Sequence, residues 1–395
     1  MLDNNFVRRT WAQVSLDALE HNFKSIKDRV SSDTKILAVI KSDAYGHGVA
    51  QVARTLSDCG AYCFAVAFAD EGVELRNNGI DNPIMLLGYT PMSQAERIIK
   101  YDIQPAVMGY DMAKHFSDEA VKLGKECKIH IKLDTGMSRV GFVCSDDESV
   151  NSAALDEIIK VSKLPCIKIE GMFTHFAMAD SADDPLTEAQ FARFMNMSDL
   201  LEKAGVSIPI KHVCNSAALL RYPHMHLDMV RAGIILYGVE PSDEVKWDID
   251  LEPVMQLKTI LTQIKTMHGD EGVSYGCRYT AQKGDVIGTI PVGYADGYSR
   301  SMSGKAYVIA GGVRVPVVGT ICMDQCMIKL NGVNNISVED EITLFGKSGD
   351  SQVSIEEVAK WKNTISYEIL CDIGRRVPRV YTKDGKISAV KNYLV

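Results

Sequence analysis

Eight short apolar segments recur along the first 240 residues, and this recurrence constrains the fold more than any other feature of the sequence. Each segment has the length of a buried strand, and stretches with a helical spacing of apolar residues lie between them. Two of these stretches open with helix-start signals, at residues 17–20 and 187–190. The apolar segments are residues 35–40, 63–68, 83–88, 103–107, 128–133, 167–173, 210–214 and 227–238.

Eight strands that alternate with helices predict an α/β fold, a TIM-type (β/α)₈ barrel, which typically takes about 250 residues. The alternative is an open doubly wound sheet. Such sheets carry a G-x-G-x-x-G turn after the first strand, and no turn of this kind follows residues 35–40. We therefore predict a barrel domain over residues 1–243.

The character of the sequence changes beyond Pro241. From about residue 250 the chain is rich in strand and turn signals, and one clear helix is expected, at residues 354–361 (SIEEVAKW). We predict that residues 244–395 form a separate, mainly antiparallel β domain. The length of 395 residues suits one large barrel with a smaller domain beside it.

Composition argues against several classes of function. The net charge of −8 comes from interspersed charges without a basic run, so nucleic acid is not an expected partner. No apolar segment has the length of a membrane span, and the first residues lack the apolar core of a signal peptide. The ten cysteines include no C-x-x-C pair, so we expect no metal site. These features predict a cytoplasmic protein with reduced thiols.

Polar residues at the ends of the predicted strands are the candidate site, because barrel enzymes place their active sites there. Serine and glycine after the seventh and eighth strands suit a phosphate group. A phosphate site together with a strand-end lysine suggests a phosphorylated aldehyde held as a Schiff base, which describes pyridoxal phosphate. The candidates are Lys41, Tyr45, Lys132, Asp134, Arg139, His175, Asn215, Ser216, Arg231, Gly233 and Ile234.

Each of these residues, taken alone, also fits a purely structural role. A strand-end lysine is usually solvated, and a lone histidine such as His175 is more often a core residue. Arg231 has the nearby Asp228 as a partner, and Asn215 has the residue type of a helix N-cap. Their joint placement on one rim of the barrel favours the functional interpretation.

Nine separated motifs, together with RTWAQVSLDAL near residue 9, extend the pattern over nearly the whole chain, as far as residue 381. They are AVIKSDAYGHG, KLDTGMSRVGF, FTHFA, NSAA, RAGIILYG, VSYGCRYTA, VGYADGY, GTICMDQCM and SYEILCDIGRRVPRVY. Together they resemble the alanine racemase family, the fold-type III pyridoxal-phosphate enzymes of bacteria. The resemblance implies a barrel followed by a β domain, and an isomerase that interconverts L- and D-alanine and supplies D-alanine for peptidoglycan.

The resemblance also implies two catalytic bases. Lys41 matches the lysine that forms the Schiff base, and Tyr275 matches the tyrosine that reaches the site from the partner subunit. A homodimer with two shared active sites is therefore implied. Two bases suit racemisation, because a proton leaves one face of the α-carbon and another returns to the opposite face.

Further residues match positions around the cofactor. Arg231 matches the residue that faces the pyridine nitrogen, and a guanidinium stays protonated, so proton exchange is favoured over decarboxylation. His175 is expected to link Arg231 to Tyr275, and Asn215 is placed among the cofactor-binding residues. The phosphate-holding positions are matched by Tyr45, Ser216, Gly233, Ile234 and Tyr367.

The remaining matches concern the substrate. Arg139 matches an arginine that contacts the substrate carboxylate, and Lys132 matches a lysine that is carbamylated in many members. Met323 and Asp324 match positions that meet the substrate carboxylate across the dimer, and Tyr294 matches a tyrosine at the narrow entrance.

Three serines depart from the family pattern. Alanine is expected at Ser42, glycine or asparagine at Ser138, and proline at Ser366. The last departure bears on the backbone at Tyr367, because proline would have restricted φ there.

Three other functions compete with alanine racemisation. A racemase for serine or for a broader set of amino acids is the nearest, since small side-chain differences are worth only about 1–3 kcal/mol. Tyr367 and Tyr294 favour alanine because they would crowd a larger side chain. Arg231 argues against a decarboxylase, and the β domain with Tyr275 argues against a non-catalytic cofactor carrier, which would resemble the barrel alone.

Overall fold

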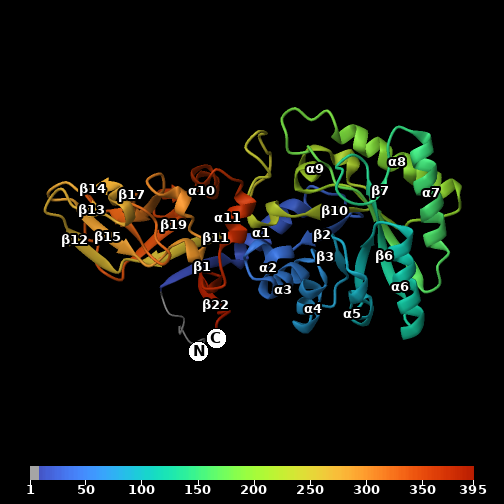
Figure 1. The fold of residues 1–395 in the computed structure, drawn as a ribbon, viewed down its shortest axis with the longest axis horizontal. Coiled ribbons are helices and arrows are strands. Elements are labelled where there is room, and N and C mark those ends of the chain that lie inside the picture. Colours follow the sequence, from blue (N-terminus) through green and yellow to red (C-terminus); the bar gives the residue numbers. More distant parts are fainter. Residues whose placement is uncertain (1–8) are drawn as a thin grey trace. The chain divides into compact units, whose positions relative to one another are not determined.

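The structure is a computed structural model that describes residues 9–395, and these divide into two compact units (Figure 1). We call residues 20–44 and 49–251 the barrel unit. The β unit comprises residues 9–19, 45–48 and 252–395.

The barrel unit contains the eight parallel strands that the apolar segments predict, with helices around them (Figure 1). Their order is β10-β2-β3-β4-β5-β6-β8-β9. The barrel is nearly closed, because Arg231 N on β10 donates to Cys214 O just after β9, at 3.1 Å. The strands are β2 (Lys35–Val39), β3 (Cys63–Val66), β4 (Ile84–Leu86), β5 (Ile103–Val107), β6 (Cys127–Asp134), β8 (Ile167–Phe173), β9 (Ile210–His212) and β10 (Met229–Ala232).

Amphipathic helices alternate with these strands. In α3, Val49, Val52, Ala53 and Leu56 are buried, which is the spacing of one helix face. α8 begins at Thr187, as predicted, but the predicted cap at residues 187–190 is not formed, because Leu186 is the N-cap residue and Thr187 N donates to Asp184 Oδ1 at 2.9 Å. The helices are α1 (Leu16–Lys27), α3 (Val49–Cys59), α4 (Ala69–Asn77), α5 (Ala95–Lys100), α6 (Tyr110–Leu123), α7 (Glu148–Ser162), α8 (Thr187–Lys203) and α9 (Ser216–Arg221), and a short strand, β7 (Phe142–Val143), pairs with β6.

The start of α1 differs from the predicted capping box at residues 17–20. The helix begins at Leu16, and Ser15 Oγ accepts a hydrogen bond from Ala18 N at 3.1 Å. Serine one residue before the helix therefore does the capping, because its hydroxyl reaches the exposed N–H groups of the first turn.

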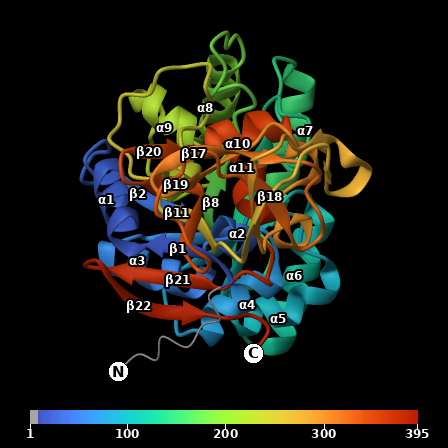
Figure 2. The ribbon, with the colours of Figure 1, turned by 90° about the vertical axis from the view of Figure 1, so that its left-hand side faces the viewer.

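The β unit is built on a mainly antiparallel sheet, as predicted. Its order is β12-β15-β18-β17-β16-β19-β11-β1-β21-β22, and Figure 2 shows β21 and β22 side by side. The strands are β1 (Thr10–Ser15), β11 (Met255–Ile260), β12 (Gln263–Thr266), β15 (Val286–Ile290), β16 (Tyr307–Ala310), β17 (Val313–Val318), β18 (Cys326–Lys329), β19 (Glu341–Ser348), β21 (Arg379–Lys383) and β22 (Lys386–Lys391); β20 (Ser351–Val353) pairs with β19, and β13 (Gly272–Val273) pairs with β14 (Tyr279–Thr280).

The structure places β1 differently from the prediction, which assigned all residues up to 243 to the barrel. β1 pairs antiparallel with β11, where Thr10 faces Thr259, and parallel with β21, where Ala12 faces Arg379. Eight later strands already complete the barrel, so the first strand is not needed there. Its partners are distant in sequence, and no local pattern reveals them.

Two helices accompany the β sheet. α10 (Ile355–Lys362) confirms the predicted helix, and its capping box joins Ser354 to Glu357. α11 (Ser366–Asp372) was not predicted, because its seven residues show little helical periodicity. In residues 9–395 no helix is long and apolar enough to cross a membrane.

Candidate active site

Lys41 follows β2 directly, at the carboxyl end of the strand. The next four residues, 42–45, all have positive φ, between 51° and 55°. The element labelled α2 (Lys41–Tyr45) is therefore a left-handed turn, which costs residues other than glycine roughly 1–2 kcal/mol each. Lys41 is partly buried, and its Nζ makes no hydrogen bond or ion pair with any residue that the structure describes.

Two carboxylates hold this turn. Glu71 Oε1 accepts a hydrogen bond from Ser42 N at 2.6 Å, and Asp43 Oδ1 accepts one from Val49 N at 2.8 Å. Strained backbone that the surrounding structure holds in this way is found preferentially at functional sites.

Tyr45 ends the turn and belongs to the β unit, where its ring centroid lies 6.1 Å from that of Tyr367 on α11. Burial, followed by the neighbouring Tyr367, raises the pKa of Tyr45, so its hydroxyl remains a hydrogen-bond donor. Gly46 and Gly48 have φ of +78° and +91°. A Cβ on Gly46 would lie 2.3 Å from Leu370 O, so only glycine allows this approach to α11.

The loops after β9 and β10 lie next to each other. Gly233 N donates to Ser216 Oγ at 2.9 Å, and both residues lie in the barrel unit. Ile234 follows and is fully buried. Asn215 Oδ1 accepts from Ala218 N at 2.9 Å, so this side chain serves as the N-cap of α9.

Arg231 is only 3% exposed and is held by four neighbours. Nη1 donates to His212 O at 2.9 Å and lies 3.2 Å from His212 Nδ1. Nη2 donates to Thr174 O at 2.8 Å and Val213 O at 2.9 Å, and lies 3.3 Å from His175 Nδ1. Its Nε has no acceptor among residues 9–395. Burial lowers the pKa of Arg231 to about 10, so it remains a cation at neutral pH.

His175 is a neutral imidazole. Burial, and next the charge of Arg231, hold its pKa well below the usual value. Because arginine can only donate hydrogen bonds, His175 Nδ1 is the acceptor and the proton resides on Nε2. His175 therefore presents an N–H group on the side away from Arg231.

Lys132 is buried at the end of β6, with Nζ 5.4 Å from the ring centroid of Phe173. Burial, followed by the charge of Arg231, lowers the pKa of Lys132 to about 7. About half of these side chains are therefore uncharged amines at neutral pH. An uncharged amine is the form that reacts as a nucleophile.

The loop after β6 is organised by Asp134. Its carboxylate accepts from Gly136 N at 3.1 Å, Ser138 N at 3.0 Å and Arg139 N at 2.8 Å. Burial raises the pKa of Asp134, but these N–H groups and the charge of Lys132 outweigh it and the pKa is lowered. The loop presents an exposed Arg139. Ser138 has a φ of 56°, which explains why glycine or asparagine suits this position.

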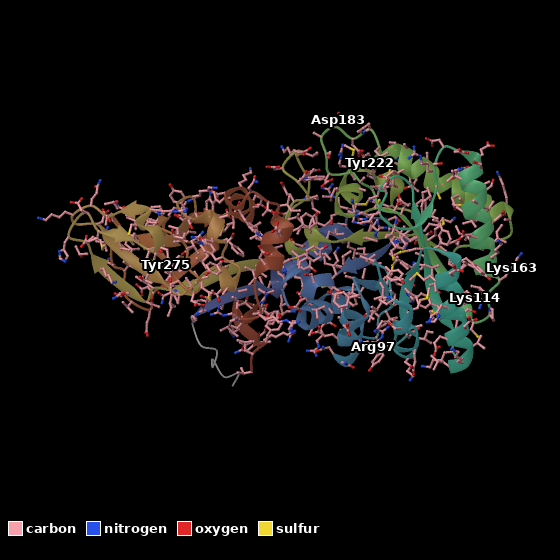
Figure 3. The ribbon with its side chains drawn as sticks, in the orientation of Figure 1. Arg97, Lys114, Lys163, Asp183, Tyr222 and Tyr275 are labelled. Atoms are coloured by element: carbon pink, nitrogen blue, oxygen red, sulfur yellow. The ribbon has the colours of Figure 1, made fainter. Side chains whose placement is uncertain are left out.

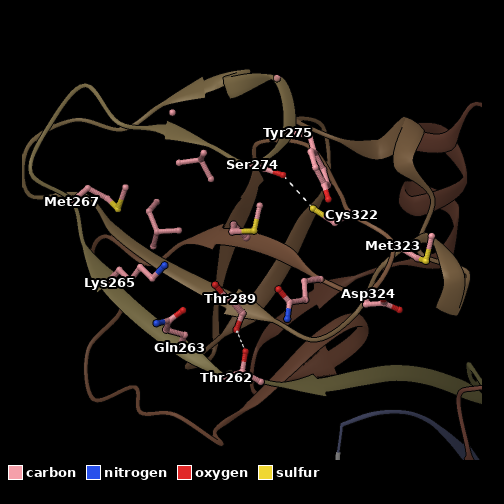
Figure 4. A pocket seen from close by; sticks show the side chains of 16 residues that line it. Thr262, Gln263, Lys265, Met267, Ser274, Tyr275, Thr289, Cys322, Met323 and Asp324 are labelled. Atoms are coloured by element: carbon pink, nitrogen blue, oxygen red, sulfur yellow. Dashed lines mark hydrogen bonds between the residues drawn. The ribbon is translucent and has the colours of Figure 1, made fainter.

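Tyr275 projects from a turn of the β unit and is 71% exposed (Figure 3). It lies at an open pocket of about 990 Å³, which is seen from close by in Figure 4. The turn is held from behind, because Thr320 Oγ1 donates to Tyr275 O at 2.8 Å and Ser274 Oγ donates to Thr320 O at 2.6 Å.

Met323 and Asp324 line the same pocket (Figure 4). Met323 is 52% exposed, whereas Asp324 Oδ1 accepts from Arg376 Nη2 at 2.7 Å. Ala295 N, next to Tyr294, donates to Met323 O at 3.1 Å, so the turn that carries Tyr294 is joined to this loop.

The predicted residues thus fall into three groups. Those after the barrel strands lie in the barrel unit, Tyr45 and Tyr367 lie together in the β unit, and the other predicted β-unit residues lie at or beside the pocket of Figure 4. Two contributors were not predicted, Glu71 and His212. A polar residue inside the apolar segment 210–214 was the only available signal for His212.

A near-closed parallel barrel with a lysine at a strand end, followed by a β domain with an exposed tyrosine, defines a class of two-domain barrel enzymes. Comparison with known proteins is more specific. The alanine racemase N-terminal domain model matches residues 14–241, and the alanine racemase C-terminal domain model matches residues 254–381.

Relatives agree over the whole length. An alanine racemase of Clostridium tetani is 46% identical over 98% of this chain and 99% of its own. The structure of alanine racemase from Clostridium difficile 630 in complex with cycloserine has a TM-score of 0.92 at 42% identity, covering 99% of this chain and 100% of that chain. Alanine racemase from Bacillus anthracis with bound L-Ala-P has a TM-score of 0.90 at 37% identity, covering 98% and 99%. The chain belongs to the alanine racemase family and is an amino-acid racemase, an isomerase.

Proposed function

We propose that the protein interconverts L- and D-alanine with pyridoxal phosphate, using Lys41 and Tyr275 of the partner subunit as its two bases. The observation that carries this proposal is Arg231, a buried cation whose Nη groups are engaged and whose Nε–H is unused by any residue in the described chain. Arg231 Nε does not belong to the fully buried polar atoms without a partner, so its N–H remains accessible to the acceptor atom of a ligand.

The residues present fit the cofactor. Arg231 Nε–H suits the ring nitrogen, and the amine of Lys41 suits the aldehyde. The positions that match the phosphate-holding residues of the family offer hydroxyl groups or backbone N–H groups, and they are Tyr45, Ser216, Gly233, Ile234 and Tyr367. When bound, pyridoxal phosphate supplies an electron sink that acidifies the α C–H bond of an amino acid.

The two bases would act on opposite faces of the substrate. Lys41 moves the proton at the α-carbon on one face, and Tyr275 of the partner subunit moves it on the other. His175 supports the tyrosine, because its Nε2–H can donate to the phenolic oxygen and stabilise the deprotonated form. Arg231 contributes by keeping its own proton, which limits the electron sink and favours proton exchange over other reactions.

A homodimer follows from the same assignment. The exposure of Tyr275 and Met323 at an open pocket supports a surface that a second copy covers. Arg139 would bind the substrate carboxylate from the barrel side, Met323 and Asp324 from the other subunit, and Tyr294 would narrow the entrance. Asn215 would act indirectly, by capping the helix that carries Ser216.

The substrate and setting are proposed by analogy with the relatives. Alanine is the substrate in the names of the C. tetani and C. difficile proteins, and cytoplasmic supply of D-alanine for peptidoglycan is the role we propose. A broader racemase that also accepts serine is the second candidate, because one hydroxyl is weakly discriminated in a small pocket.

Proton exchange tests the two-base assignment. The α-proton exchange of L- and D-alanine in deuterated water is followed with added pyridoxal phosphate, and L-serine is run beside them. Tyr275→Phe should lose proton abstraction from L-alanine by roughly 10²-fold to 10⁴-fold, and far less from D-alanine. Tyr307→Phe, an exposed tyrosine outside the pocket, is the control. Wild-type protein without exchange, or equal effects on both enantiomers, would overturn the assignment.

A further inference from the structure

A chain of four buried side chains runs through the barrel unit from Arg231. Arg231 Nη1 lies 3.2 Å from His212 Nδ1, His212 Nε2 lies 3.1 Å from His130 Nδ1, and His130 Nε2 lies 3.0 Å from Gln104 Oε1. The residues come from β10, β9, β6 and β5, and none is more than 5% exposed. Arg231 and His212 belong to the candidate active site described above, whereas His130 and Gln104 lie beyond it.

Only one arrangement of protons satisfies all three links. Arginine has donors and no acceptor, so His212 Nδ1 must accept and its proton must reside on Nε2. His212 then donates to His130 Nδ1, which places the proton of His130 on Nε2. Gln104 must in turn present its oxygen. Reversal of any link would bring two N–H groups face to face, so the direction of the whole chain is determined by Arg231.

Both histidines are neutral. Burial lowers the pKa of His130 to about 3, and burial followed by the charge of Arg231 lowers that of His212. Arg231 makes no ion pair with any residue in the described part of the chain. Its charge is therefore balanced by backbone carbonyl groups and by aligned neutral dipoles, which strengthen one another in a low-dielectric interior.

A glycine in the barrel leaves room for these four hydrogen-bonded side chains. Strand β8 lies between β6 and β9, and its Gly171 has no side chain to separate the two histidines. A Cβ there would lie 2.5 Å from His130 Nδ1. The ring of Phe173 stacks on His212, with centroids 5.1 Å apart and an interplanar angle of 5°, and prevents the imidazole from turning.

We propose that Gln104 and His130 are positioning residues for Arg231. They fix the orientation of His212, so that His212 Nδ1 stays an acceptor for Arg231. The fixed acceptor sets the plane of the Arg231 guanidinium and the direction of its unused Nε–H. The inference rests on the proposed function in one respect, that Arg231 Nε–H faces the ring nitrogen of the cofactor. Gln104 thus influences the reaction from the opposite end of a hydrogen-bond chain, without contact with substrate or cofactor.

Two substitutions at Gln104 distinguish an effect of the hydrogen-bond chain from an effect of side-chain packing. Gln104→Met keeps the length but removes the acceptor, whereas Gln104→Glu keeps an acceptor oxygen. Gln104 and His130 line a pocket of about 160 Å³, which gives both variants room. Ser117→Ala is the matched control, because it removes a buried hydrogen bond of the same unit, from Ser117 Oγ to Pro165 O at 2.6 Å, away from Arg231.

The first measurement needs neither cofactor nor activity. Nitrogen NMR of histidine-labelled wild-type protein should show His130 and His212 as neutral Nε2–H tautomers between pH 5 and pH 9. Gln104→Met should change the ring-nitrogen shifts of both histidines, and Ser117→Ala should not. An imidazolium, or an Nδ1–H tautomer at His212, would overturn the inference whatever the enzyme does.

The second measurement uses the enzyme with cofactor. Gln104→Met should lower kcat for alanine about fivefold to tenfold with little change in KM, because one hydrogen bond in the chain that leads to a charged group is lost. Gln104→Glu should retain most of the wild-type kcat. Pyruvate formation by abortive transamination should rise relative to racemisation in Gln104→Met alone. Equal behaviour of Gln104→Met and Ser117→Ala would refute the inference. A wild-type protein that does not racemise alanine would refute the proposed function and leave the NMR result standing.

Discussion

Two buried cationic side chains, Lys132 and Arg231, lie over the same ring of Phe173, with centroid distances of 5.4 and 5.6 Å. A contact of this kind contributes about 2 kcal/mol when it is desolvated, which is less than the cost of burying an isolated charge. The ammonium is compact and strongly hydrated, whereas the guanidinium spreads its charge and is held by several acceptors. At neutral pH Arg231 therefore keeps its proton, and Lys132 is partly an uncharged amine.

This difference predicts a pH-dependent carbamylation of Lys132. The amine loses its proton as the pH rises through about 7, so the reactive fraction should rise from about one-tenth at pH 6 to about nine-tenths at pH 8. Carbon NMR with labelled bicarbonate should show a carbamate signal that grows over this range. Lys132→Arg is the control and should show no signal. A signal that is unchanged in the variant, or that grows toward low pH, would contradict the proposal.

At the scale of elements, α11 shows how a departure from the family pattern is accommodated. Ser366 is the first residue of this helix, and Ile365 before it is extended, with φ −108° and ψ 155°. The first helical position tolerates proline, because its N–H has no partner within the helix. Serine therefore maintains the helix that carries Tyr367, and a proline here would restrict the unfolded chain more than the folded one.

Ser366→Pro should accordingly raise the free energy of unfolding by about 0.4–1 kcal/mol. Denaturant unfolding of the two proteins measures the difference. Ser162→Pro, at the last position of α7, is the comparison and should lower stability by about 3 kcal/mol, because proline there removes a hydrogen bond inside the helix. Destabilisation by Ser366→Pro would show that the backbone at α11 differs from the one described.

At the scale of the whole molecule, the β unit exposes two large apolar side chains at one pocket. Tyr275 and Met323 project at one pocket, and the turns below them are held by backbone and hydroxyl hydrogen bonds. Side chains of this size on rigid turns are typical of interfaces. The proposed active site needs a second copy for this reason, since Tyr275 of one chain must serve the other.

Met323→Glu should weaken this association. A charge buried at an interface without a partner is unfavourable, so we expect dimer dissociation to become at least about tenfold easier. Sedimentation over a dilution series measures it. Val338→Glu places the same charge on an exposed side chain of the β unit outside the pocket and should leave the dimer unchanged. Equal effects of the two variants, or a wild-type monomer, would contradict the proposed dimer.

Hydrophobic periodicity was sufficient to predict the barrel, because the apolar residues of each strand and helix recur at the spacing of its buried face. The strand-end residues followed, since parallel strands bring their carboxyl ends to one rim. The resemblance supplied the β-domain residues such as Tyr275, whose types alone carry no chemical signal. None of this required contacts between distant residues.

Other features depend on contacts that no local pattern records. β1 lies between β11 and β21, which both come far later in the sequence. The left-handed turn at residues 42–45 is held by Glu71 and by packing at Gly46. His130 and His212 meet because Gly171 on the strand between them leaves room. The sequence by itself determined the elements and the residues at their ends, because those depend on neighbouring positions. The tertiary structure decided the turn, the sheet order and the hydrogen bonds of Arg231, because they depend on which distant groups satisfy one another.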